Sequence, residues 1–228
     1  MSAMQKQSTV GKDVSFERIR RITGYLVGTM DKWNDAKKAG TRPCETWSVL
    51  RLQIMMELNV AGIVGESIVD GPGIRLTVFC QGCPHHCPGC QNPETWEFAE
   101  RTRMSPEQIL EMVKRNPLIR GVTLSGGEPF SQPEEHAQLA QLLHQNGYEV
   151  AAYTGYTFEQ LLEGTPQQRH LLENIDVLVD GPFLLEKKTL ELRFRGSSNQ
   201  RVLNVPESLA QGKAVWESRE SWVGERRF

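Results

Sequence analysis

The sequence predicts an α/β fold whose strands pair in parallel. Apolar or β-rich runs at residues 74–79, 122–124, 148–153 and 175–179 alternate with helix signals. Helices between successive strands imply crossover connections, which join parallel neighbours in a sheet. With 228 residues and 39% apolar side chains, the chain is long enough for one sizeable domain and an appendage.

The helix signals are capping boxes followed by apolar residues at helical spacing. Boxes at residues 105–108, 131–134 and 157–160 each place a hydroxyl acceptor three residues before a Glu or Gln. Three helices are therefore predicted to begin just after residues 105, 131 and 157. Residues 193–205 are polar and then strand-like, and the sequence does not place them in the sheet.

The N-terminal part of the chain differs from the rest in charge. The net charge is -2, yet residues 1–51 hold ten Lys or Arg against five Asp or Glu. The patterned sequence begins near the tandem Met55-Met56, so we expect a domain at residues 55–228 and a largely flexible extension at residues 1–54. No apolar run approaches the roughly 18 residues of a membrane span, and no secretory signal is present. We therefore expect a cytoplasmic protein with neither nucleic acid nor membrane as its partner.

Four of the five cysteines lie within eleven residues, directly after the predicted strand 74–79. They are Cys80, Cys83, Cys87 and Cys90. Thiolates gathered on one tight loop are a soft ligand set for zinc or for an iron-sulfur cluster. In a reducing compartment this arrangement favours metal or redox chemistry over a disulfide framework.

Three kinds of site compete for these cysteines. A zinc module would use all four, although structural zinc sites usually split their ligands into two separated pairs. A ferredoxin-like electron carrier would have the spacing C-x2-C-x2-C-x3-C, whereas the order here is C-x2-C-x3-C-x2-C. The third possibility is that Cys83, Cys87 and Cys90 hold a four-iron cluster and leave one iron open. We interpret His85 and His86, in the same loop, as polar groups rather than ligands.

A second motif follows the predicted strand 122–124. It consists of Ser125, Gly126, Gly127 and Glu128. Glycines allow backbone to approach a ligand closely, and a carboxylate can accept a hydrogen bond from an ammonium group. Taken alone, the same residues also fit an ordinary turn between a strand and a helix.

Together, a CxxxCxxC loop after a first strand and an SGGE turn one βα unit later resemble the radical S-adenosylmethionine superfamily. The resemblance implies a partial (β/α) barrel with parallel strands, in which the three cysteines bind a 4Fe-4S cluster. It further implies that the open iron chelates S-adenosyl-L-methionine, whose methionine end is held by residues 125–128. Backbone at Gly89 and Gln91 is expected to contact the same cofactor, and Cys80 is expected to be a spectator.

Six motifs in order narrow the resemblance over residues 57–205. They are DGPGIR, GCPHHCPGCQNPETW, TLSGGEPF, YTGY, VLVDGPF and RFRGSSNQRV. Jointly they are similar to the activating proteins of the anaerobic ribonucleoside-triphosphate reductase. The resemblance implies an oxidoreductase that reductively cleaves S-adenosylmethionine and generates a glycyl radical on the reductase, with a reducing donor such as a flavodoxin. The alternatives are an activator of another glycyl-radical enzyme, a non-catalytic iron-sulfur carrier and a zinc module.

The N-terminal extension carries a resemblance of its own. Residues 16–39 are similar to the C-terminal glycyl-radical segment of the reductase itself, with Gly24 at the radical position. We expect a fused or misread upstream reading frame, with the native start near Met55 or Met56. The alternative is a tethered substrate peptide that enters the site of its own chain.

Overall fold

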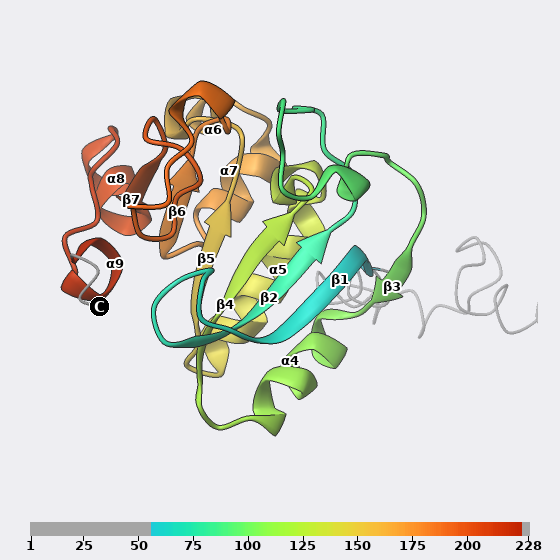
Figure 1. Cartoon of the computed structure of the whole chain (residues 1–228). Helices are drawn as coiled ribbons and strands as arrows, with labels where there is room; N and C mark the ends of the chain where they lie inside the picture. Colours follow the sequence, from blue (N-terminus) through green and yellow to red (C-terminus); the bar gives the residue numbers. More distant parts are fainter. Residues whose placement is uncertain (1–55, 225–228) are drawn as a thin grey trace, which may run out of the picture. The chain divides into compact units, whose positions relative to one another are not determined.

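The computed structural model describes residues 56–224 (Figure 1). Within this range seven strands join in one sheet, in the order β3-β1-β2-β4-β5-β6-β7. The predicted N-terminal extension and its Gly24 lie outside the described residues. None of the helices in the described part is long and apolar enough to span a bilayer.

The four central strands are parallel, as the alternation of strands and helices predicts. They are β2 (Ile74–Cys80), β4 (Ile119–Gly126), β5 (Glu149–Tyr153) and β6 (Val177–Asp180). The helices that connect them are α4 (Pro106–Arg115), α5 (Pro133–Gln145), α6 (Phe158–Leu162) and α7 (Pro166–Leu172). A mixed α/β fold with a sheet containing parallel strands is therefore confirmed.

Antiparallel strands flank this centre, and the sequence reading missed their arrangement. They are β1 (Leu58–Ser67), β3 (Thr102–Met104) and β7 (Arg201–Asn204). The predicted first strand is therefore the second in the chain. The sequence did not predict β1, because Gly62 and Gly65 interrupt its β-rich pattern. A closed barrel is not confirmed, since the strand order starts at β3 and ends at β7.

Two of the three predicted capping boxes are confirmed. Ser105 with Gln108 caps α4, and Thr157 with Gln160 caps α6. The box predicted at residues 131–134 is wrong, because Pro133 occupies the first turn and shifts the start of α5 beyond Ser131. The structure adds an unpredicted box at residues 165–168, which caps α7.

A hydrophobic core lies on each face of the sheet. The larger core lies between the sheet and helices α4 to α8, where α8 spans Val205–Gln211. Alternation along β6 separates the two faces, because Leu178 belongs to this core while Val177 and Val179 belong to the second. The second core is closed by Trp222 of α9 (Glu220–Val223). The C-terminal segment thus completes a layer that the strands alone leave open.

We predict that Trp222→Ala lowers the free energy of unfolding by about 3 to 5 kcal/mol, the usual loss for a buried Trp. The Trp222 side chain is 1% exposed, and its ring meets Phe194 edge to face at 5.4 Å between centroids. The Arg75 guanidinium also lies over it, 5.4 Å from the ring centroid. Urea denaturation measures the change. Trp216→Ala is the control, because Trp216 is 53% exposed; equal losses in the two variants would contradict the prediction.

A buried histidine in α5 gives stability a pH dependence. His136 is fully buried, and its Nδ1 lies 2.8 Å from the Gln132 carbonyl oxygen. Since a carbonyl only accepts, Nδ1 carries the proton, and the buried Nε2 has no partner within residues 56–224. Burial lowers the pKa of His136 to about 4. The folded protein therefore holds this imidazole neutral down to that pH.

We predict that lowering the pH from 6.5 to 4 removes on the order of 3 kcal/mol of stability through His136, given its pKa of about 4. The unfolded chain binds a proton on this residue below pH 6.5 and the folded chain does not, so protons favour unfolding; below pH 4 the effect levels off. When the denaturation midpoint is plotted against pH, His136→Leu should lack the part of the decrease between pH 6.5 and 4 that His136 causes. His170→Leu, at an exposed position, is the control and should retain it.

Candidate functional site

Four chain segments that the motifs occupy meet at one edge of the sheet. Because β2, β4, β5 and β6 are parallel, their carboxyl ends lie together. The cysteine loop follows β2 and the TGY segment follows β5, while the SGGE motif begins at the end of β4 and the DGPF motif at the end of β6. Residues that are far apart in sequence are thereby collected at the edge where open α/β sheets bind ligands.

The four clustered cysteines differ in their surroundings. Cys80 is the last residue of β2 and is fully buried, whereas Cys83, Cys87 and Cys90 are partly exposed on the loop. Burial, with a smaller contribution from the negative Glu128, raises the pKa of the Cys80 thiol well above its usual value. Three thiols are therefore accessible, and the fourth is a protonated core residue.

Backbone N–H groups are directed at two of the three accessible sulfurs, those of Cys83 and Cys90. The Asn92 N–H donates to Cys90 Sγ at 3.4 Å, and the Cys90 N–H donates to the Cys87 carbonyl at 3.1 Å. Burial raises the pKa of the Cys83 thiol, and the backbone N–H groups of His85 and His86 act in the opposite direction. Hydrogen bonds of this kind stabilise thiolates and tune iron-sulfur clusters.

The donor set is of the kind that iron-sulfur clusters use. Among residues 56–224, no three His, Cys, Asp or Glu side chains converge closely enough to hold one metal ion. In a four-iron cluster each thiolate binds a different iron, so its ligands stand farther apart than those of zinc. Three partly exposed thiols on one loop, with N–H groups directed at two of the sulfurs, are chemically suited to hold an iron-sulfur cluster.

The SGGE turn is bonded directly to the start of the cysteine loop. The Gly127 N–H donates to the Cys80 carbonyl, and the Glu128 N–H donates to the Gly82 carbonyl, both at 2.8 Å. A Cβ on Gly127 would lie 2.4 Å from the Gly82 oxygen, and one on Gly126 would lie 2.5 Å from the Cα of Phe79. The two glycines are thus required for loop packing, a reason that the sequence reading did not give.

Glu128 occupies a more internal position than its predicted contact with an ammonium group implies. The residue is fully buried. Its carboxylate accepts from the N–H groups of Phe130 and Gly155 at 3.0 and 2.9 Å, from Thr154 Oγ1 at 2.9 Å, and from His85 Nε2 at 2.8 Å. An ammonium group would have to replace one of these donors, so in this structure Glu128 ties the turn to neighbouring segments.

The two adjacent histidines have different environments, which the sequence reading did not distinguish. His85 points to Glu128 and meets the Tyr156 ring edge to face, with 4.5 Å between centroids. His86 is exposed and stacks on Trp96 at 5.1 Å. Neither is part of a metal-binding group among the described residues. Thr154, Gly155 and Tyr156 were not predicted as site residues, although they follow a predicted strand, and the rule for strand ends is the signal that could have placed them near the site.

The loop after β6 is held by the GSSNQ motif. The Gln200 amide donates to the Gly181 carbonyl at 3.1 Å and accepts from the N–H groups of Gly196 and Ser197 at 2.9 and 3.2 Å. Asn199 donates to the Pro182 carbonyl at 2.8 Å. These contacts fold residues 181–200 back on themselves at the carboxyl edge.

The predicted backbone contacts at the end of the cysteine loop are also at this edge. Gly89 has a φ of +73° and lies against Leu185, since a Cβ there would be 2.8 Å from Leu185 Cδ1. Gln91 is exposed beside it. The loop after β6 therefore packs on the far end of the cysteine loop, while the SGGE turn packs on its start.

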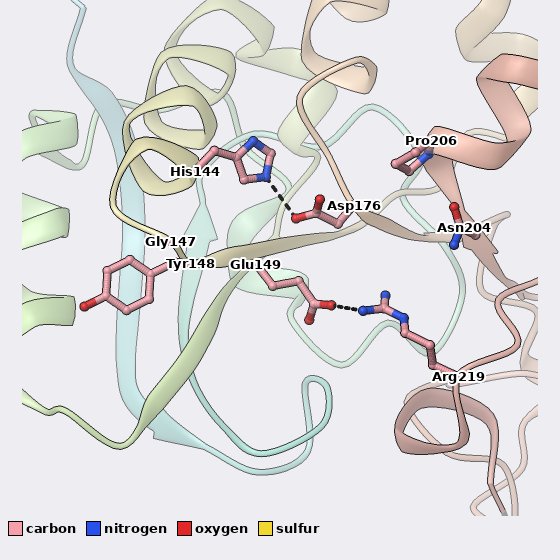
Figure 2. Close-up of a pocket in the computed structure, with 8 residues that line it drawn as sticks. All are labelled: His144, Gly147, Tyr148, Glu149, Asp176, Asn204, Pro206 and Arg219. Carbon is pink, nitrogen blue, oxygen red and sulfur yellow. Dashed lines mark hydrogen bonds and ion pairs between the residues drawn. The ribbon is translucent and has the colours of Figure 1, made fainter.

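A cavity of about 540 Å³ lies at the opposite edge of the sheet (Figure 2). It is lined by His144, Gly147, Tyr148, Glu149, Asp176, Asn204, Pro206 and Arg219. Its charges pair with one another, since His144 Nε2 lies 2.9 Å from Asp176 and Arg219 lies 2.6 Å from Glu149. None of the predicted site residues lines this cavity, and its Glu149–Arg219 pair joins the C-terminal segment to β5.

Known proteins resemble the whole region that forms this edge. A protein-family model described as "4Fe-4S single cluster domain" matches residues 69–203. The anaerobic ribonucleoside-triphosphate reductase-activating protein of Escherichia coli K12 is 36% identical over 144 residues, covering 59% of this chain and 91% of the relative. The protein of the same name from Pasteurella multocida is 38% identical over 154 residues, covering 64% and 96%.

A solved structure, QueE from Escherichia coli, also matches in part. It is 24% identical and superposes with a TM-score of 0.40, covering 51% of this chain and 59% of QueE. The assignment of the chain to a family therefore comes from the sequence relatives.

We predict that Gly127→Ala lowers the free energy of unfolding by about 1 to 3 kcal/mol, as overpacked positions do. The new Cβ would meet two backbone oxygens, those of Gly82 and Cys80, at 2.4 and 2.9 Å, and backbone cannot rotate away. Chemical denaturation measures the loss. Gly62→Ala is the matched control, since nothing lies within 4 Å of its Cβ; a loss as large in the control would remove the packing explanation.

Proposed function

This chain belongs to the family of anaerobic ribonucleoside-triphosphate reductase-activating proteins and carries its 4Fe-4S single cluster domain, and from this premise we propose its chemistry. The chain acts as an activase that generates a glycyl radical on the reductase. The observation that carries the proposal is the junction of two motifs at one edge of the sheet. The SGGE turn is hydrogen-bonded to Cys80 and Gly82, just before the CxxxCxxC segment, and to His85 within it.

In this proposal Cys83, Cys87 and Cys90 hold the 4Fe-4S cluster. The turn of residues 125–128 and the backbone at Gly89 and Gln91 would hold S-adenosyl-L-methionine. When bound, the one-electron-reduced cluster and this cofactor would supply the radical chemistry that removes a hydrogen atom from a glycine of the reductase, with methionine and 5'-deoxyadenosine as products. The protein orients and shields these groups, since the difficult chemistry is that of the cofactors.

The chain's own residues determine which thiols can bind iron and which side chains border the cysteine loop. Cys80 is buried in the core and does not compete for iron. The Phe98 ring lies over Gly82, and Leu185 lies against Gly89, so apolar side chains border both ends of the cysteine loop. Both side chains are largely exposed, 66% for Phe98 and 50% for Leu185, so they border the loop without enclosing it. We further propose that the sheet corresponds to a partial (β/α) barrel of the radical S-adenosylmethionine type.

The proposal includes the partners. The reductase is the protein substrate, and a one-electron donor such as a flavodoxin reduces the cluster in the cytoplasm. Residues 55–228 form the activase domain. Residues 1–54, with Gly24, are an extension outside it.

We predict that replacing Cys83, Cys87 or Cys90 by Ala abolishes reductive cleavage of S-adenosylmethionine, whereas Cys80→Ala retains it. Each of the three loop thiols would be lost as a ligand to a separate iron, while Cys80 faces the core. Iron content after anaerobic reconstitution, the EPR spectrum of the reduced protein and the yield of 5'-deoxyadenosine measure the effect.

Two results would count against this assignment. Cleavage retained by the Cys87 variant would remove that residue from the ligand set. Stoichiometric zinc, with no broad visible absorption after reconstitution, would replace the activase by a zinc module.

A further inference from the structure

We infer that His85 is a positioning residue, which fixes the middle of the cysteine loop on the cofactor-binding turn through Glu128. The inference rests on the proposed function and adds a residue to its machinery. His85 is not a ligand in this arrangement, because its Nε2 is directed at the Glu128 carboxylate, 2.8 Å away.

The two side chains form a shielded pair. His85 is 18% exposed and Glu128 is 1% exposed. A hydrogen bond to a buried carboxylate is among the stronger kinds. Removing the His85 donor would leave the Glu128 carboxylate one hydrogen bond short at a buried position that water does not readily reach. The pair joins residues 43 positions apart in the chain. It is therefore a tertiary connection between the loop after β2 and the turn after β4.

The neighbouring strand end is shaped to receive the imidazole. A Cβ on Gly155 would lie 2.4 Å from His85 Cδ2 and 2.6 Å from its Cγ and Nε2. The three nearest atoms to that position all belong to His85, and the backbone of Gly155 has no positive φ. Residue 155 is thus a glycine because the His85 ring leaves no room for a Cβ, and not because its backbone has a left-handed conformation. Tyr156 covers the ring on another side.

His85 lies between two predicted cluster ligands, so its contact with Glu128 affects the geometry of the site. Backbone hydrogen bonds from Gly127 and Glu128 fix only the start of the loop, at Cys80 and Gly82. His85 lies midway between Cys83 and Cys87, where its side chain is bonded to the same turn. The positions of two predicted ligands relative to the cofactor-binding turn therefore depend on this imidazole. Outer contacts that orient ligands typically change metal affinity or activity by about 10- to 100-fold when they are removed.

The test compares the two adjacent histidines in the full-length chain. His85→Ala should weaken S-adenosylmethionine binding to the reconstituted protein by about 10- to 100-fold and reduce the cofactor-induced change in the EPR spectrum. His86→Ala, which removes the same group from an exposed position of the same loop, should leave both unchanged. His85→Gln should recover part of the affinity, because its amide can still donate to Glu128.

A readout without cofactors separates positioning from a purely structural role. Hydrogen exchange of the cluster-free protein should show faster exchange at residues 83–90 in His85→Ala than in His86→Ala. Exchange in the core strands and the thermal unfolding midpoint should be alike in the two variants. General destabilisation by His85→Ala, with loop and core affected equally, would overturn the inference.

Gly155→Ala provides an independent check, because it should displace the imidazole without removing it. In the otherwise unchanged chain it should weaken S-adenosylmethionine binding as His85→Ala does. In the His85→Ala background it should have little further effect, since the atoms it would strike are absent. Additive losses in the double variant would contradict a shared role.

The outcomes distinguish the inference from the function on which it rests. If the unsubstituted protein takes up no iron and cleaves no S-adenosylmethionine, the proposed function fails and the inference fails with it. If the unsubstituted protein is active and the His85 and His86 variants match it, the inference alone is wrong.

Discussion

The parallel pairing of β2 with β4 is the constraint on which the site depends. Its register sets Cys80 opposite Gly126, so the two chain segments that leave these strands emerge side by side. Gly127 and Glu128 can then donate their N–H groups to the Cys80 and Gly82 carbonyls, and only glycine fits at 126 and 127 in this packing. The same register brings the Glu128 carboxylate within reach of the imidazole in the cysteine loop. A slip of one residue would reverse the faces and separate these groups.

At the opposite edge of the sheet, ion pairs hold the strands and the C-terminal segment together. The Arg75 side chain is fully buried and donates to Thr123 Oγ1 at 2.7 Å and to Glu149 at 2.7 Å. Glu149 also pairs with Arg219, which brings the C-terminal segment to the sheet and places Trp222 over Arg75. A buried cation requires such partners, because its desolvation is otherwise unfavourable. One edge is thus locked by ion pairs and aromatic packing, while the other presents three accessible thiols.

Local signals in the sequence were sufficient where a few adjacent residues decide the structure. The boxes at Ser105 and Thr157 begin helices because each hydroxyl accepts from the backbone N–H of the Gln three residues later, while that Gln side chain accepts from the backbone N–H of the capping residue. The prediction failed near Ser131 because a proline moved the helix start, and it missed β1 because antiparallel pairing with β2 and β3, rather than its own alternation, makes that segment a strand. The family resemblance named the cysteine loop and the SGGE turn, yet it assigned their glycines to the cofactor rather than to packing.

By itself, the sequence determined the α/β class, the cysteine spacing and the motifs whose order identifies the family, because these are properties of residues close together in the chain. Tertiary structure decided which cysteine is buried, what Glu128 contacts and why Gly155 is a glycine. Those properties arise between segments about 30 to 70 residues apart, and they depend on strand register and loop packing that no local pattern records. The His85–Glu128 pair is the clearest case, since each residue alone reads as an ordinary polar group, and only the sheet brings them to 2.8 Å.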